Sequence, residues 1–281
     1  MTGSHIRSLP GRAKRRTIRD VGGAAQDGLP GWVTLVRAPN PGPMTLDGTN
    51  TWVLRAAGAG DAVVIDPGPL DDGHLATIAE HAPVSTILIT HGHGDHVAGA
   101  AKLSRLLGGA PVRAADPRHC VDGDPLVPGR LTLAGLELEV LATPGHTADS
   151  VCFVTDDAVF TGDTILGRGT TVVAHPDGDL GAYLDSLDVL TAYPRILLPG
   201  HGPAQEDCAG VARAYLAHRR ERLAQVRAAI AEGADSPKAI VDSVYRDIDP
   251  KIRFAAEMSA RAQLEYLRRE SQPGSQQLDS L

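Results

Sequence analysis

A cluster of metal-competent side chains in residues 90–99, THGHGDHVAG, limits the possible folds of this chain more than any other segment. His91, His93 and His96 share this short segment with Asp95. The run directly before it, Val84 to Ile89, is short, apolar and rich in β-branched residues, which predicts a buried strand. The cluster is therefore expected at the carboxyl end of a strand, and a helix from Val97 to Leu107 is expected to follow.

The spacing within the cluster indicates two metal ions. In an extended segment alternate side chains point the same way, so His91 and His93 can face one ion together. Asp95 and His96 lie where the chain turns into the helix, and they can serve a second ion. The alternative is a polar loop whose histidines only cap a helix, but four metal-competent side chains at this density are not typical of a plain turn.

Three later segments place a His or Asp in a Gly-rich turn after a predicted strand. They are His146 in TPGHT, Asp163 in TGDT and His201 in PGHGP. In a layered α/β fold such strand ends converge on one edge of the sheets. We therefore predict one set of His91, His93 and His146, a second set of Asp95, His96 and His201, and Asp163 as a bridge between the two ions.

Asp66 ends another apolar segment, Ala62 to Asp66, and is followed by Pro67-Gly68. It either orients a metal ligand from behind or simply forms a turn, and the sequence leaves both open. His175, in the segment after Asp163, is a candidate for the substrate pocket, with an ordinary surface-loop histidine as the alternative.

Composition narrows the class of protein. The 281 residues contain 27 Lys and Arg against 34 Asp and Glu, so the formal net charge is 27 − 34 = −7 and no global basic field indicates nucleic acid. Cys120, Cys152 and Cys208 are scattered and form no CxxC pair, which favours a reducing compartment. No apolar run approaches the roughly 18 residues of a membrane span, and we expect a cytoplasmic protein without membrane contact.

The chain divides into three predicted parts. Residues 1–31 form a basic, Gly-rich segment that is expected to be flexible, with an RNA-contacting arm as the alternative. Residues 32–203 read as the catalytic domain, in which short strands and helices alternate. Residues 204–281 contain apolar positions at helical spacing and two N-cap plus proline signals, Ser236-Pro237 and Asp249-Pro250, which predict a three-helix appendage. Its arginines are a solvated face, a packing or homodimer surface, or a contact for nucleic acid.

The four motifs together, THGHGDH, TPGHT, TGDT and PGHG, resemble the metallo-β-lactamase superfamily of dinuclear metal hydrolases, with Asp66 in the first of its motif positions. The resemblance implies an αββα sandwich with the metals at one edge. The imidazole-rich ligand set favours two Zn²⁺ ions, with Mn²⁺ or Fe²⁺ as alternatives. The two ions are expected to share a hydroxide, with Asp95 and Asp163 as catalytic residues.

Other features of the sequence indicate a branch of the superfamily. The appendage resembles the winged-helix-like C-terminal module of the β-lactamase-like protein 2 family, whose best-known member is a mitochondrial single-strand endoribonuclease. This implies a phosphodiesterase acting on single-stranded RNA. The alternative is a thioesterase of the glyoxalase II type or another small-ester hydrolase, although His201 lies here in a GHGP context rather than GHEY. A β-lactamase or an inactive metal-binding scaffold is disfavoured, because Asp163 replaces the Cys or Ser of classical lactamases and all seven ligands are present.

Overall fold

Two five-stranded mixed sheets form the centre of the computed structural model, which describes residues 28–271. The first sheet has the order β1 (Val33–Arg37), β2 (Asn50–Leu54), β3 (Ala62–Ile65), β4 (Val84–Leu88) and β5 (Val112–Arg113). The second has the order β10 (Ile196–Pro199), β9 (Ala158–Gly162), β8 (Val151–Val154), β7 (Leu136–Ala142) and β6 (Gly129–Leu133). Most of the basic segment predicted for residues 1–31, including all its arginines and its lysine, lies outside the described residues.

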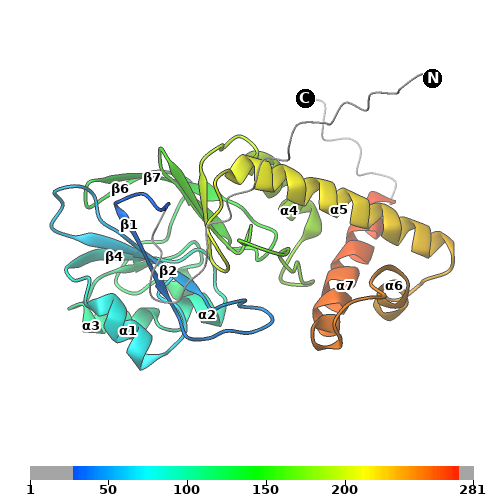
Figure 1. The fold of residues 1–281 in the computed structure, drawn as a ribbon, viewed down its shortest axis with the longest axis horizontal. Coiled ribbons are helices and arrows are strands. Elements are labelled where there is room, and N and C mark those ends of the chain that lie inside the picture. The colour runs from blue at the N-terminus through cyan, green and yellow to red at the C-terminus, as the bar shows by residue number, and fades with distance from the viewer. Residues whose placement is uncertain (1–27, 272–281) are drawn as a thin grey trace, which may run out of the picture.

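The sheets pack face to face over an apolar core, and helices cover their outer faces (Figure 1). Trp52 of the first sheet meets Phe160 of the second edge-on, with 6.1 Å between the ring centroids. The outer face of the first sheet packs against α1 (Asp72–Ala79) and α3 (Ala100–Leu106). The second packs against α4 (Leu180–Leu190) and α5 (Cys208–Ala231). The predicted αββα sandwich is confirmed.

Backbone hydrogen bonds join the loops that carry the candidate ligands. The Val151 amide donates to the Thr90 carbonyl at 2.9 Å and so links the first sheet to the second. The Asn50 amide donates to the carbonyl of Gly200, whose own amide donates to Gly162, both at 2.7 Å. Because these bonds run between strand ends, the four motif segments meet at one edge of the sandwich.

The helix expected from Val97 to Leu107 is interrupted, which corrects that prediction. The structure has a short α2 (Gly94–Val97) and then α3, with a break at Gly99. A Cβ on Gly99 would lie 2.7 Å from Leu75 Cδ2 and 2.9 Å from the Pro69 carbonyl oxygen, and the Gly99 amide donates to Gly68 instead. Close packing against the loop after β3 therefore overrides helix continuity.

The helices after β10 are α5, α6 (Pro237–Val244) and α7 (Arg253–Glu270), with a 3₁₀ turn, η2 (Pro250–Ile252), before α7. They lie together at one end of the molecule in Figure 1, and α5 runs from the sandwich into this group. No strand follows these helices within residues 204–271. The resemblance to a winged helix therefore stays a prediction, and so does the domain boundary at residue 203. None of the described helices has the length and apolar character needed to span a membrane.

Candidate metal centre

The structure brings all seven predicted ligands together at the sheet edge. His91 and His93 follow β4, and Asp95 and His96 belong to the short α2. His146 comes from the loop after β7, and the remaining two ligands, Asp163 and His201, follow β9 and β10. Most of them are buried, with 0% exposure for His96 and 9% for Asp163, whereas 42% of the His93 side chain is exposed.

The first set of ligands consists of three imidazoles around one point. His93 Nδ1 lies 3.1 Å from His91 Nε2 and 3.1 Å from His146 Nε2. Two nitrogens bound tetrahedrally to one zinc ion at about 2.0–2.1 Å lie roughly 3.4 Å apart, so this spacing suits a single small cation.

The second set combines two imidazoles and a carboxylate. His201 Nε2 lies 3.0 Å from Asp95 Oδ2 and 3.2 Å from His96 Nε2. Asp163 lies between the two sets, because its Oδ2 is 3.4 Å from His201 Nε2 and 3.8 Å from His146 Nε2. This arrangement suits two neighbouring ions that share the Asp163 carboxylate.

The ring nitrogens that point away from the centre meet acceptors of the protein. His146 Nδ1 lies 2.8 Å from the Val172 carbonyl, and His201 Nδ1 lies 3.2 Å from the Gly48 carbonyl. His96 Nδ1 lies 2.8 Å from Asp66 Oδ2. A proton on Nδ1 satisfies each of these contacts and leaves the Nε2 lone pair free for a metal ion.

Asp66 contacts both the candidate ligand His96 and Thr90, the residue directly before His91. It receives hydrogen bonds from the backbone amide of Thr90 at 2.8 Å and from the Thr90 hydroxyl at 2.7 Å, in addition to the contact with His96. It is 1% exposed, and its φ of 53° lies in the left-handed region that Asp tolerates better than most residues. Of the two roles left open by the sequence, the geometry favours orientation of His96.

A further observation supports metal binding. Asp163 Oδ1 is buried and accepts no hydrogen bond from any residue that the structure describes. A buried carboxylate oxygen without a donor is costly unless a cation neutralises it. The imidazole-rich donor set fits zinc and also other divalent transition metals.

The electrostatics divide the histidines into two groups. Burial, reinforced by the neighbouring His96, lowers the pKa of His91 well below its usual value, and burial also lowers the pKa of His146. Burial acts in the same direction on His201, but the Asp163 carboxylate and hydrogen bonds with Asp163 and Asp95 outweigh it and raise the pKa to about 9. Burial is likewise outweighed at His96, where Asp163 and Asp66 raise the pKa. Without metal, protons therefore concentrate on the second set.

Several groups at this site have no clear signal in the sequence. Thr49 Oγ1 donates to Asp95 Oδ2 at 3.2 Å, and Asn50 Nδ2 donates to the carbonyls of Pro199 and Gly202 at 3.0 and 2.8 Å, which holds the His201 loop on β2. Asp177 Oδ2 lies 3.6 Å from His93 Nε2. The polar triplet Thr49-Asn50-Thr51, fully buried at the start of an otherwise apolar strand, is the one pattern that could have drawn attention to β2.

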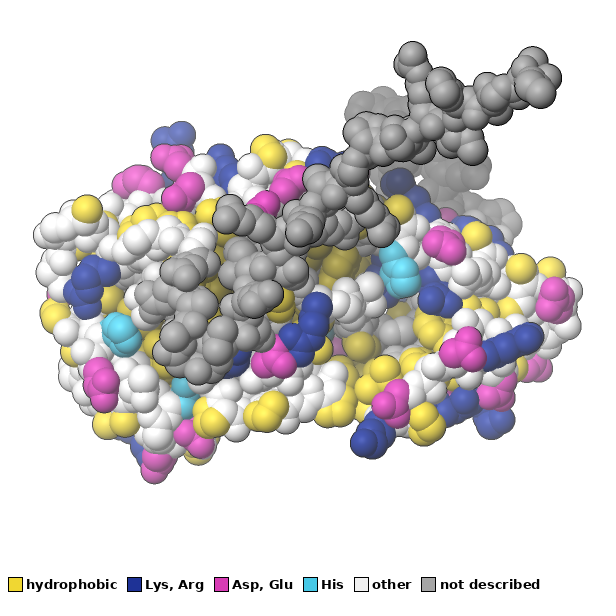
Figure 2. Space-filling model, in the orientation of Figure 1, with side chains coloured by type: hydrophobic (Ala, Val, Ile, Leu, Met, Phe, Trp, Pro, Cys, Tyr) yellow, Lys and Arg dark blue, Asp and Glu magenta, His cyan; other side chains and the backbone are white. Residues whose placement is uncertain are grey.

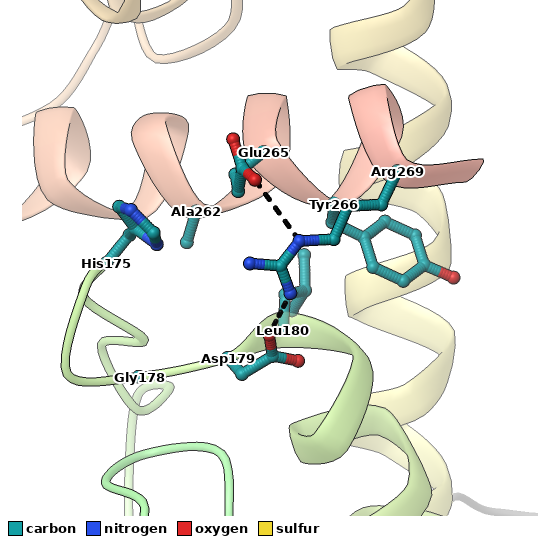
Figure 3. Close-up of a pocket in the computed structure, with 8 residues that line it drawn as sticks. All are labelled: His175, Gly178, Asp179, Leu180, Ala262, Glu265, Tyr266 and Arg269. Atoms are coloured by element: carbon teal, nitrogen blue, oxygen red, sulfur yellow. Dashed lines mark hydrogen bonds and ion pairs between the residues drawn. The ribbon is translucent and has the colours of Figure 1, made fainter. Parts of the chain in front are cut away.

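His175 lines a small polar pocket between the loop before α4 and helix α7 (Figure 3). The loop before α4 contributes His175 and Asp179, and α7 contributes Glu265 and Arg269. Arg269 Nη1 donates to Asp179 Oδ2 at 2.6 Å and Arg269 Nε to Glu265 Oε1 at 3.1 Å. The structure thus places His175 in a pocket that includes residues of α7, and its role in substrate binding stays a prediction.

Replacing Asp66 by Asn should weaken the second metal site. Asn tolerates the left-handed backbone, but its amide would present a donor to His96 Nδ1 and so favour the tautomer with the proton on Nε2. We expect affinity for the second ion to fall about 10- to 100-fold, measured by competition with a chromophoric chelator. Asp61→Asn, at an exposed position before β3, is the matched control and should bind like the wild type. Equal affinities for both variants would show that Asp66 only forms a turn.

Comparison with known proteins agrees with this geometry. The family model of the metallo-beta-lactamase superfamily matches residues 44–119. The chain is 32% identical to the atrochrysone carboxyl ACP thioesterase of Aspergillus fumigatus, over 83% of this chain and 79% of that protein. It is 36% identical to the beta-lactamase-like protein 2 homolog of Drosophila melanogaster, over 66% of this chain and 70% of that protein.

A solved structure shows the same architecture. The metallo-beta-lactamase family protein TTHA1429 from Thermus thermophilus superposes with a TM-score of 0.69 at 25% identity, covering 85% of this chain and 94% of that one. Superfamily members typically hold two divalent metals, and the His and Asp clusters of this chain provide sites for them. The chain therefore belongs to the metallo-beta-lactamase superfamily and is a metal-dependent hydrolase.

Proposed function

We propose that this protein is a thioesterase that uses a dinuclear zinc centre to hydrolyse acyl thioesters of a small thiol or a carrier-bound thiol. The observation that carries the proposal is the 32% identity to a curated thioesterase, which extends over 79% of that protein and 83% of this chain. The same centre suits ester hydrolysis in general, and the thioester is distinguished by its leaving group.

Two bound divalent ions would supply a hydroxide nucleophile at neutral pH and positive charge beside the carbonyl oxygen. His91, His93 and His146 would hold one ion, Asp95, His96 and His201 the other, and Asp163 would bridge them. All seven side chains are then committed as ligands. A thiol with a pKa of about 8.5 departs as thiolate without a strong proton donor, so this arrangement suits a thioester better than a poor alkoxide leaving group.

Charges near the centre support a substrate that is not a polyanion. Asp47 and Asp116 are paired with Arg168 and Arg118 respectively. Asp177, with 62% of its side chain exposed, lies beside His93. On the face seen in Figure 2, basic and acidic side chains are interspersed over the C-terminal helices. Such a surface offers less attraction to a phosphate backbone than a continuous basic groove.

Single-stranded RNA is the second candidate substrate. It is favoured by the similarity to the beta-lactamase-like protein 2 homolog and by the resemblance of the C-terminal helices to that family. Under this candidate the arginines of α5 and α7 would contact phosphates, and binding would weaken steeply with salt. We also propose a cytoplasmic location, because the three cysteines are free, as is typical of a reducing compartment. A homodimer is a further proposal.

The zinc-loaded protein should release thiol from S-lactoylglutathione and from a short acyl-pantetheine, followed with a thiol-reactive dye. His93→Ala should lower kcat/KM by at least about 100-fold, because it removes one ligand of the first ion. His81→Ala, which changes a partly exposed histidine after α1, should have little effect. Labelled single-stranded RNA and DNA serve as parallel substrates. Metal-dependent cleavage of RNA with intact thioesters would overturn the thioesterase proposal in favour of the nuclease.

A further inference from the structure

One buried cation of the C-terminal helices, Arg219 on α5, is not explained by the site as described. Its side chain is 5% exposed, and its Nε has no hydrogen-bond partner within residues 28–271. Its guanidinium lies over the ring of Tyr183 at 5.1 Å from the centroid, and its Nη2 donates to the Thr171 carbonyl. A buried charge with so few partners costs more free energy than an apolar side chain of similar length.

The contacts of Arg219 lead to the bridging carboxylate. Thr171, whose carbonyl accepts from Arg219, donates its hydroxyl to the backbone carbonyl of Asp163 at 2.8 Å. Tyr183, whose ring faces the guanidinium, donates to the Thr164 carbonyl at 2.7 Å. Arg219, on the long helix α5, is therefore linked to the backbone of Asp163 through Thr171.

A second contact from the same helix reaches the same segment. The backbone amide of Leu166 donates to the hydroxyl of Tyr215, one turn before Arg219 on α5, at 3.1 Å. The segment from Asp163 to Thr171 is therefore fixed from α5 at two points. Beyond it, the Val172 carbonyl lies 2.8 Å from Nδ1 of the ligand His146.

We propose that Arg219 is a positioning residue: through Thr171 it holds the segment of the bridging carboxylate Asp163, and the C-terminal helices thereby set the affinity for the second metal ion. This inference rests on the dinuclear site proposed above, but not on the identity of the substrate. It assigns the C-terminal helices a role at the metal centre that applies to either a thioester or an RNA substrate.

The test compares Arg219→Met with the wild type, using Arg220→Met as the matched control on the exposed side of the same helix. Metal affinities are measured by chelator competition, and thermal unfolding is measured on the metal-free proteins. For Arg219→Met we expect affinity for the second ion to fall about 10- to 100-fold. The metal-free Tm should move by no more than about 4 °C, because the cost of burying the charge is removed together with its contacts. Turnover of the active substrate should lose kcat with KM unchanged.

Thr171→Val tests the path independently, because it removes the hydroxyl that reaches Asp163 and Thr164. If Arg219 acts through Thr171, the double variant should lose little more affinity than either single variant. Should Arg219→Met fail to fold, Thr171→Val alone carries the test through the same metal titration. Wild-type affinity for both ions in these variants, or losses that simply add, would overturn the proposal. Absence of thioester turnover with an altered metal titration would count against the thioesterase only.

Discussion

Asp163→Asn is expected to reduce turnover roughly 1,000-fold and to lower the metal content from two ions per chain to one. The Asp163 carboxylate lies between the two sets of ligands, and burial would raise its pKa if His201 and His96 did not outweigh it and lower the pKa well below its usual value. An amide keeps the size of the side chain but removes the negative charge that holds two dications close together. Steady-state kinetics and elemental analysis of the dialysed protein measure both effects.

The matched control for this variant is Asp156→Asn in the exposed turn between β8 and β9. It makes the same chemical change on a neighbouring strand end, so it separates the loss of the bridge from any general effect of charge. If Asp163→Asn retained two ions and turned over at a rate close to that of the control, the assignment of Asp163 as the bridge would be wrong.

Affinity for the second ion is expected to rise by at least tenfold per pH unit between pH 6.5 and 9, or at least roughly 100-fold from pH 7 to 9. The ion must displace the proton of His201, whose pKa burial would lower but Asp163 and Asp95 hold at about 9. It must also displace the Nε2 proton of His96, because Asp163 and Asp66 outweigh burial there and raise the pKa as well. An unperturbed imidazole would already be neutral above about 6.5 and would give no slope in this window. The first ion should show none there, because burial lowers the pKa of both His91 and His146.

The raised pKa of His201 has the opposite effect on the stability of the metal-free protein, which falls as the pH rises. Since the pKa of His201 is raised on folding, its contribution to stability is complete below about pH 6.5 and is lost as the pH rises through about 9. Chelator competition at pH 7, 8 and 9 measures the affinity, and calorimetry in two buffers counts the protons released. Asp95→Asn should flatten the slope, because it removes one of the carboxylate partners of His201. A second-site affinity independent of pH over this range would contradict the proposed proton displacement.

Much of the secondary structure follows from local patterns. α4 (Leu180–Leu190) is an example, because Asp179 caps its first turn and accepts a hydrogen bond from the Ala182 amide. The hairpin of β6 and β7 is another, because apolar and polar residues alternate on either side of its turn. Gly99 shows the limit of this reasoning. Its helix break depends on packing against a loop some thirty positions earlier, which no local window contains.

The metal centre likewise has features that the sequence predicts and features that depend on contacts between distant segments. The seven candidate ligands could be predicted because only a few side-chain types bind metals, and because strand ends in this class of fold meet at one edge. The groups that orient these ligands could not be predicted. Two of the groups are the backbone carbonyls of Gly48 and Val172, and every residue of the chain has such a carbonyl. Which nitrogen of each imidazole faces the centre likewise depends on these partners.

Sequence patterns alone thus predict the candidate ligand residues, the strands and helices that separate them, and the family to which the chain belongs. Three other features depend on the folded structure: Asp66 lies behind His96, Asn50 holds the His201 loop, and Arg219 contacts Thr171 in the segment after Asp163. The physical reason is one of range. Propensity and periodicity act between residues a few positions apart, whereas burial, tautomer and pKa are set by atoms that are close in space and distant along the chain.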